Sequence, residues 1–174
     1  MTKHGYQVHT LESAPVAARA GLEQAKQRFG RVPNFFAIAA ESPAAVNAYL
    51  ALSDIFRGSA LTPAEQQIVI LTASVENKCD YCVAAHSRGA NAAGVPEETI
   101  SAIKQRVPLR DGKTEALRRF VSQTVRDRGW LLDEDVQAFL REGYSKAQML
   151  DVMVGVSMKT LSNYINHLTD PPLE

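Results

Sequence analysis

The chain has 174 residues, enough to bury one hydrophobic core, so we expect a single domain over residues 1–174. Its 19 basic and 19 acidic side chains balance, which argues against a nucleic-acid partner or an anionic lipid surface. No apolar run approaches the about 20 residues that a membrane-spanning helix needs, and the N-terminus carries no apolar signal segment. We therefore expect a cytoplasmic protein that binds neither nucleic acid nor membrane.

The apolar periodicity is helical along almost the whole chain, and the alternation typical of strands is absent. The expected helices cover residues 11–29, 35–38, 43–56, 63–75, 81–93, 97–107, 117–125, 134–141 and 146–168. Several of them begin with capping signals. The expected caps are Ser42, Thr62 paired with Glu65, Asp133, and Ser145 paired with Gln148. The sequence thus predicts an all-α fold of seven to nine helices.

The only two cysteines, Cys79 and Cys82, are three residues apart, and His86 follows four residues later. Two cysteines placed at random in such a chain would have this spacing in about one chain in a hundred. On a helix with about 100° per residue, the three side chains fall within about 60° of one another. Two thiols that can reach each other, with a base on the same face, predict a redox site in a core of about residues 61–94.

Other interpretations of these three residues remain open. Cysteine packs as a small hydrophobe, so the pair could be ordinary core, and His86 could be a hydrogen-bonded core histidine. The three side chains could also hold a zinc ion with an open fourth position. Covalent haem attachment is excluded, because it needs a histidine directly after the second cysteine, where Val83 stands.

Residues 76–86, Glu-Asn-Lys-Cys-Asp-Tyr-Cys-Val-Ala-Ala-His, closely resemble the core motif of the alkylhydroperoxidase AhpD-like branch of the carboxymuconolactone decarboxylase superfamily. Residues 30–35 and 61–65 resemble the segments that precede this motif, and residues 143–145 and 163–166 resemble its C-terminal part. The resemblance implies an AhpD-like helical bundle that oligomerises as a dimer, trimer or hexamer. We expect the apolar segment 149–158, with its small residues, to pack on another subunit.

The resemblance further implies a thiol-dependent alkyl hydroperoxide reductase or disulfide reductase. By position, Cys82 would attack the peroxide, Cys79 would resolve the resulting sulfenic acid as a disulfide, and His86 would relay the proton. The sequence has no flavin, nicotinamide or phosphate-binding signature, so we expect no cofactor and no metal. Electrons would then come from a thiol carrier, thioredoxin-like or lipoyl-like, and the substrate would be an organic hydroperoxide or a disulfide.

One position departs from the family pattern. Mycobacterial-type members have a glutamate twelve residues before the first cysteine, where this chain has Gln67, and an amide cannot relay a proton. We expect Glu76, one turn before Cys79, to orient His86 in its place, because on an unbroken helix it would lie within about 120° of Cys82. Glu65 is the second candidate, although its capping box already explains it.

Two other classes of function also remain open. One is decarboxylase or lactone chemistry, as in the branch that gives the superfamily its name, although that branch does not rely on a cysteine pair. The other is a non-enzymatic, redox-sensing oligomer in which the disulfide would switch packing.

Overall fold

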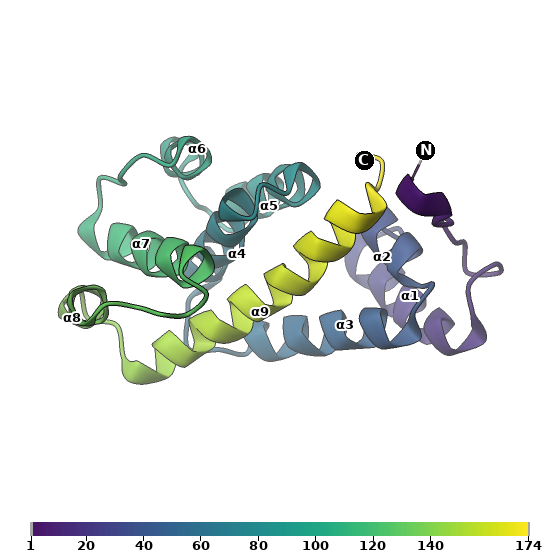
Figure 1. Ribbon diagram of the computed structural model, residues 1–174, viewed down its shortest axis with the longest axis horizontal. Helices are drawn as coiled ribbons and strands as arrows, with labels where there is room; N and C mark the ends of the chain where they lie inside the picture. Colours follow the sequence, from purple (N-terminus) through teal and green to yellow (C-terminus); the bar gives the residue numbers. More distant parts are fainter. Residues whose placement is uncertain (1, 174) are drawn as a thin grey trace. The chain divides into compact units, whose positions relative to one another are not determined.

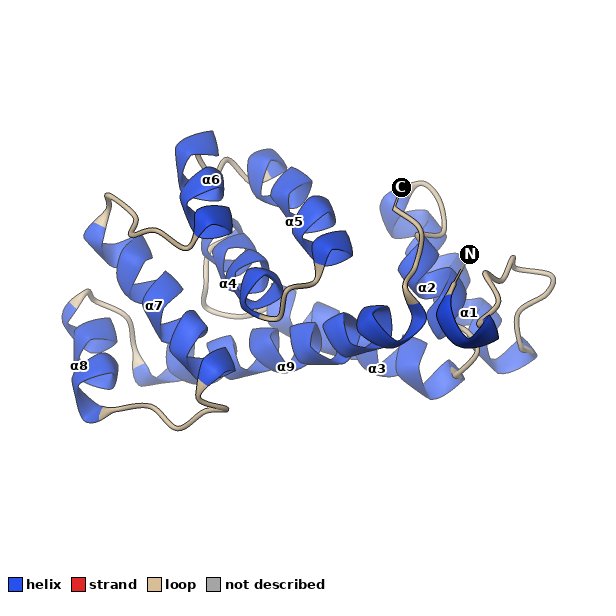
Figure 2. Cartoon of the chain, turned by 45° about the horizontal axis from the view of Figure 1, so that its top comes forward, coloured by secondary structure: helices blue, strands red, loops and turns tan. Residues whose placement is uncertain are grey.

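The computed structural model describes residues 2–173, and within them the chain is helical, with no strand (Figure 2). After a short 3-10 turn at Lys3–Gly5 come α1 (Val16–Phe29), α2 (Asn34–Ala39), α3 (Pro43–Arg57), α4 (Pro63–Glu76), α5 (Asp80–Ala92), α6 (Glu97–Gln105), α7 (Gly112–Arg126), α8 (Asp133–Arg141) and α9 (Lys146–Thr169). These nine α-helices of the described chain confirm the predicted all-α class and the predicted helix number.

The helices form two compact units. The first takes in the chain up to Asp54 and again from Leu161 onwards, and the second is Ile55–Thr160. In the first unit, the rings of Phe35 and Phe36 pack edge-on against Tyr49, with centroids 4.8 and 5.4 Å apart. Every residue singled out as a candidate for chemistry lies in the second unit.

Helix α4 is the centre of the second unit. It lies between α5 and α7 and packs against both, and it also contacts α6 (Figure 1). Its side chains are buried over most of its length, including Ile68, Val69 and Leu71 at 2% exposure or less. A helix that is apolar on nearly all sides is stable only when neighbours surround it, which explains why three helices pack on α4.

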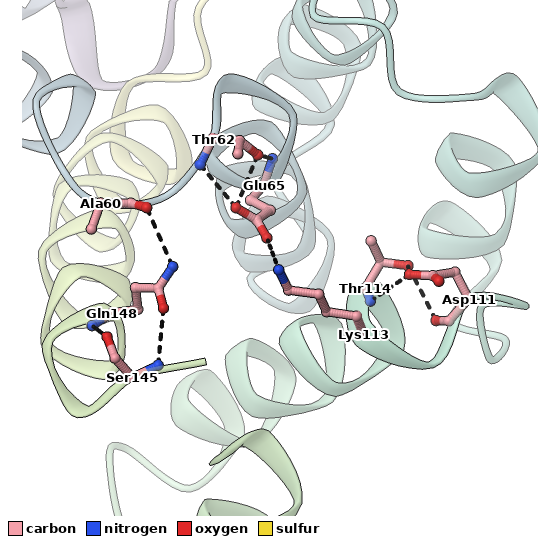
Figure 3. A network of polar contacts seen from close by, with 8 residues as sticks. All are labelled: Ala60, Thr62, Glu65, Asp111, Lys113, Thr114, Ser145 and Gln148. Carbon is pink, nitrogen blue, oxygen red and sulfur yellow. Dashed lines mark hydrogen bonds and ion pairs between the residues drawn. The ribbon is translucent and has the colours of Figure 1, made fainter. Parts of the chain in front are cut away.

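Reciprocal capping boxes begin α4 and α9, as the sequence predicts (Figure 3). The backbone N–H of Thr62 donates to Glu65 Oε2 at 2.8 Å, and the N–H of Glu65 donates to Thr62 Oγ1 at 3.3 Å. At the start of α9, the backbone N–H of Ser145 donates to Gln148 Oε1 at 2.9 Å, and the N–H of Gln148 donates to Ser145 Oγ at 3.1 Å. Each box satisfies two backbone donors that have no partner inside the helix.

The predicted cap of α8 is wrong by one residue. Leu132 occupies the N-cap position, and Asp133 is the first residue of the helix. Asp133 then stands in an acidic first turn with Glu134 and Asp135, where negative charge is favourable next to the positive end of the helix dipole.

Gly155 of α9 makes a close contact within the chain. A Cβ at this position would lie 2.7 Å from the ring of Phe56 and 2.9 Å from Val69 Cγ1. The space beside Gly155 is therefore filled by Phe56 and Val69 of the same unit, so Gly155 is not the residue that admits another subunit. Oligomerisation itself stays a prediction.

Within residues 2–173, no helix has the length and apolar character needed to cross a membrane.

Candidate active site

The junction between α4 and α5 positions the first cysteine. Lys78 adopts a left-handed conformation, with φ of 57°. Its N–H donates to Val75 O, and the N–H of Cys79 donates to Ser74 O, both at 3.0 Å. This pair of bonds is a Schellman motif, which ends a helix by satisfying its last carbonyl groups. The motif places Cys79 directly at the start of the next helix.

Cys79 is the N-cap of α5, and Cys82 is the third residue of that helix. The two thiols form no disulfide, and both are buried, at 2% and 4% exposure. The side chain of an N-cap residue reaches towards the third helical position, so the two sulfurs belong to the same helix end. The positive end of the helix dipole favours a thiolate there.

Lys159 of α9 reaches this helix end. Its Nζ lies 3.3 Å from Cys82 Sγ and 2.9 Å from His86 Nε2, and its side chain is buried, at 1% exposure. The amine thus contacts both the sulfur and the imidazole, although Lys159 is 77 residues from Cys82 in sequence. An ammonium group beside a cysteine stabilises the thiolate, which is the nucleophilic form.

His86 is half-buried, and burial lowers its pKa well below the usual value because it removes hydration from the charged ring. The positive charge of Lys159 lowers the pKa of His86 further. The imidazole is therefore neutral at neutral pH, with one N–H and one free lone pair. Within the part of the chain that the structure describes, its hydrogen bond is the one with Lys159.

The predicted hydrogen bond between Glu76 and His86 is not made. Glu76 closes α4, and its carboxylate accepts a hydrogen bond of 2.6 Å from Ser122 Oγ of α7. It also lies 3.7 Å from Arg106 Nε and 3.9 Å from Arg126 Nε. Because the chain breaks at Lys78, Glu76 lies on α4 and His86 on α5. Their spacing on one unbroken helix therefore does not apply. The carboxylate instead ties α4 to α7.

Glu65 is likewise engaged away from the thiols. Its oxygens bind Thr62 in the capping box and lie 3.5 Å from Lys113 Nζ of α7 (Figure 3). Burial alone would raise the pKa of Glu65, but the hydrogen bonds from Thr62 and the charge of Lys113 outweigh it and lower the pKa below its usual value. The capping box predicted from the sequence therefore accounts for Glu65.

Gln67, at the family's glutamate position, points to α5. Its Oε1 is buried without a hydrogen-bond partner and lies 2.9 Å from where a Cβ on Gly89 would be. Gly89 is three residues beyond His86 on the same helix, so the amide packs close to the site. It can neither release nor take up a proton there.

Among residues 2–173, no three histidine, cysteine or acidic side chains are grouped so that they could hold a metal ion. The amine of Lys159 instead contacts both Cys82 and His86. An ammonium at that place would repel a zinc ion.

The sequence model of the carboxymuconolactone decarboxylase family matches residues 40–123, which include both cysteines, His86 and the whole of α4 and α5. Residues 40–123 thus match the carboxymuconolactone decarboxylase family, and the fold is AhpD-like. The comparison of the sequence with curated proteins finds no match.

Solved structures share the fold at low sequence identity. A peroxidase-related protein from Ralstonia eutropha JMP134, described as an alkylhydroperoxidase AhpD core, superimposes with a TM-score of 0.85 at 20% identity, over 97% of this chain and 91% of that one. A peroxidase-related protein from Silicibacter sp. TM1040 gives 0.82 at 18% identity, over 99% and 92%. The debrominase Bmp8, as a cysteine-to-alanine variant with 2,3,4-tribromopyrrole, gives 0.74 at 18%, over 91% and 86%.

Lys159 of this AhpD-like protein is the site residue that sequence reasoning missed. The sequence places Lys159 at helical spacing from Val152 and Val156, on one apolar face. All three side chains are buried in the structure. A lysine on an otherwise apolar helix face is rarely buried without a partner. The partners could not be named from the sequence, because they lie on another helix.

Proposed function

We propose that this AhpD-like protein is a thiol-dependent oxidoreductase that reduces organic hydroperoxides, with Cys79 and Cys82 cycling between dithiol and disulfide. One observation carries the proposal: Cys82 is a buried thiol outside any disulfide, at the N-terminus of a helix and in contact with an amine that also contacts His86. Helix dipole and cation both favour the thiolate, which is the form that attacks peroxides. The motif resemblance and the AhpD-like fold support the same reaction class.

The chemistry balances in three steps. The Cys82 thiolate attacks the terminal oxygen of a hydroperoxide, the O–O bond breaks, and the alcohol leaves after gaining one proton, so that Cys82 becomes a sulfenic acid. The Cys79 thiol then attacks the Cys82 sulfur, which forms the disulfide and releases water. Two thiols of a carrier reduce this disulfide by exchange and become a disulfide themselves.

In this proposal Cys82 is the attacking cysteine, Cys79 the resolving one, and His86 supports the proton transfer at Cys82. Glu76 and Glu65 act outside the chemistry, because their carboxylates bind Ser122 and Thr62 and pair with cations of neighbouring helices. They hold α4 against α7, and α4 leads directly into the cysteine pair. The electron donor is a small thiol or a thioredoxin-like or lipoyl-like carrier, and the protein is expected to work as a homo-oligomer.

The test is a peroxidase assay of the purified protein with cumene, tert-butyl and hydrogen peroxide, each with dithiothreitol, reduced thioredoxin or dihydrolipoamide as donor. Turnover of at least one organic hydroperoxide is expected, with loss of two free thiols by thiol counting when the donor is left out. Cys82→Ser should abolish peroxide consumption. Cys79→Ser should allow one turnover and then accumulate sulfenic acid on Cys82, detectable with dimedone.

The same assay separates the alternatives. Reversible oxidation of both thiols without peroxide turnover would overturn the proposed enzyme and favour a redox sensor. Carbon dioxide release from a lactone substrate that survives Cys82→Ser would favour decarboxylase chemistry. Because Bmp8 is a debrominase crystallised with 2,3,4-tribromopyrrole, that compound belongs in the panel, and bromide release without peroxide turnover would move the substrate class to aryl bromides.

A further inference from the structure

Lys159 occupies the position between the thiol and the imidazole. Its Nζ contacts Cys82 Sγ at 3.3 Å and His86 Nε2 at 2.9 Å, so the amine bridges the sulfur and the imidazole. The side chain is 1% exposed, so bulk water does not compensate its charge, and a buried cation is stable only against groups that can accept its protons. Cys82 and His86 are two such groups.

The direction of these hydrogen bonds follows from the protonation states. An ammonium group only donates, so Nε2 of the neutral His86 ring accepts from Lys159 and the ring proton stands on Nδ1. The low pKa of His86, caused by burial and by the charge of Lys159, fits this assignment. The lone pair that would take the proton of Cys82 in a direct relay is thereby occupied by Lys159.

We propose that Lys159 is the catalytic acid and base of the site, which exchanges its proton with Cys82 and with the departing alkoxide, and that His86 is a positioning residue that holds the amine. The inference rests on the proposed thiol peroxidase function. It assigns to an amine from α9 the proton transfer that Gln67 cannot perform, since the amide of Gln67 has no ionisable proton.

The proton can be followed through one cycle. At rest, Cys82 is a thiolate and Lys159 an ammonium. Attack on the hydroperoxide breaks the O–O bond, and the ammonium gives its proton to the alkoxide, leaving an alcohol, a neutral Lys159 and the Cys82 sulfenic acid. Cys79 then forms the disulfide and its proton leaves in the water. When the carrier dithiol reduces the disulfide, its two protons restore the Cys79 thiol and the Lys159 ammonium.

From α5, the ionisable side chains of Cys82 and His86 face Lys159. On α4, the carboxylates of Glu65 and Glu76 are bound by Thr62 and Ser122 and paired with cations of other helices. A change in the pH profile of Cys82 upon substitution of Lys159 therefore reports on this amine, provided that the variant keeps the fold.

Two substitutions separate charge from proton transfer. Lys159→Met removes both, while Lys159→Arg keeps a positive charge but cannot release a proton near neutral pH. Lys146→Met is the matched control, since Lys146 is an exposed lysine at the start of the same helix. Circular dichroism and thermal melting establish which variants are folded, so that only folded protein enters the comparison.

The first measurement is the rate of Cys82 alkylation by iodoacetamide against pH, in a Cys79→Ser background that leaves one thiol. A free cysteine is a few per cent thiolate at pH 7, so Lys159→Met is expected to lose about tenfold or more of its rate at that pH. Lys159→Arg should stay within about threefold of wild type, and Lys146→Met should be unchanged. An unchanged profile in Lys159→Met would overturn the proposal.

The second measurement is the single-turnover rate of Cys82 oxidation by cumene hydroperoxide. Loss of general acid help typically costs 10²- to 10⁴-fold, so Lys159→Arg should lose about that much while its alkylation rate is retained. Full oxidation rate in Lys159→Arg would overturn the acid role. A wild-type protein that reduces no hydroperoxide would overturn the proposed function. Because alkylation needs no peroxide, the alkylation profile would still show whether Lys159 stabilises the Cys82 thiolate.

Discussion

The amine of Lys159 lies 3.3 Å from the sulfur of Cys82 and brings a buried positive charge to the first turn of α5. Cysteine reactivity depends on how much of the thiol is ionised, and a neighbouring cation increases that fraction. Helix α9 therefore contributes to the chemistry of a motif that lies entirely on α5. The Cys-x-x-Cys segment alone is an incomplete description of the site.

Cys82 is expected to react with alkylating agents before Cys79. Lys159 Nζ lies 3.3 Å from Cys82 Sγ, and a neighbouring cation favours the thiolate, which is the reactive form. Limited iodoacetamide treatment at pH 6, followed by tryptic digestion, gives one peptide over residues 79–88 that carries both cysteines. Fragment ions should place the first label on Cys82. Initial labelling of Cys79 would reverse the roles of the two cysteines.

Glu76→Gln is expected to lower stability and to leave catalysis intact. The substitution removes a buried charge that accepts from Ser122 and lies near Arg106 and Arg126. Charge-assisted hydrogen bonds of this kind contribute about 1.5–3 kcal/mol. Urea unfolding should show a loss of this order, while peroxide turnover per folded molecule stays within about twofold.

A double-mutant cycle with Ser122→Ala isolates the pair, because residues in direct contact show non-additive effects. If Glu76→Gln kept full stability but lost most of its turnover, the carboxylate would act in the proton relay after all.

The sequence predicted the architecture of this protein well because local signals define it. The capping boxes at Thr62 and Ser145 and the helical spacing of the apolar residues are properties of short segments, and the structure contains them. Such signals act through backbone hydrogen bonds and helix periodicity, which depend on neighbouring residues only.

The partners within the site could not be predicted in the same way. Glu76 was assigned to His86 on the assumption of one continuous helix, and the left-handed Lys78 turns the chain so that Glu76 faces α7 instead. Lys159 reaches Cys82 across 77 residues of sequence. Contacts of this kind depend on how helices pack against one another, and a single sequence carries no direct record of that.

Gly155→Ala is expected to destabilise the second unit. The added methyl would lie 2.7 Å from the ring of Phe56 and 2.9 Å from Val69 Cγ1, so α9 or its neighbours must shift. Overpacking of this kind typically costs about 1–3 kcal/mol. Gly112→Ala is the control, since its Cβ would be no nearer than 3.4 Å to Glu142. Chemical denaturation should separate the two variants, and equal stability would mean that the contact at Gly155 relaxes at no cost.

The unfolding free energy is expected to fall as the pH drops below about 6.5, because of His86. Burial and the charge of Lys159 hold the pKa of His86 well below the usual value in the folded protein, whereas the unfolded chain titrates near 6.5. Below that pH the unfolded state binds a proton that the folded state does not, so acid favours unfolding with a limiting slope of about 1.4 kcal/mol per pH unit.

The carboxylates with lowered pKa, Glu65 among them, lose their stabilising contribution only at pH values below about 4.5. The window from pH 6.5 to 5 therefore isolates the histidine. Urea unfolding of wild type and His86→Gln at half-unit intervals should give a steeper decline for wild type across this window, and parallel curves would show that His86 takes up a proton as readily in the folded protein as in the unfolded chain.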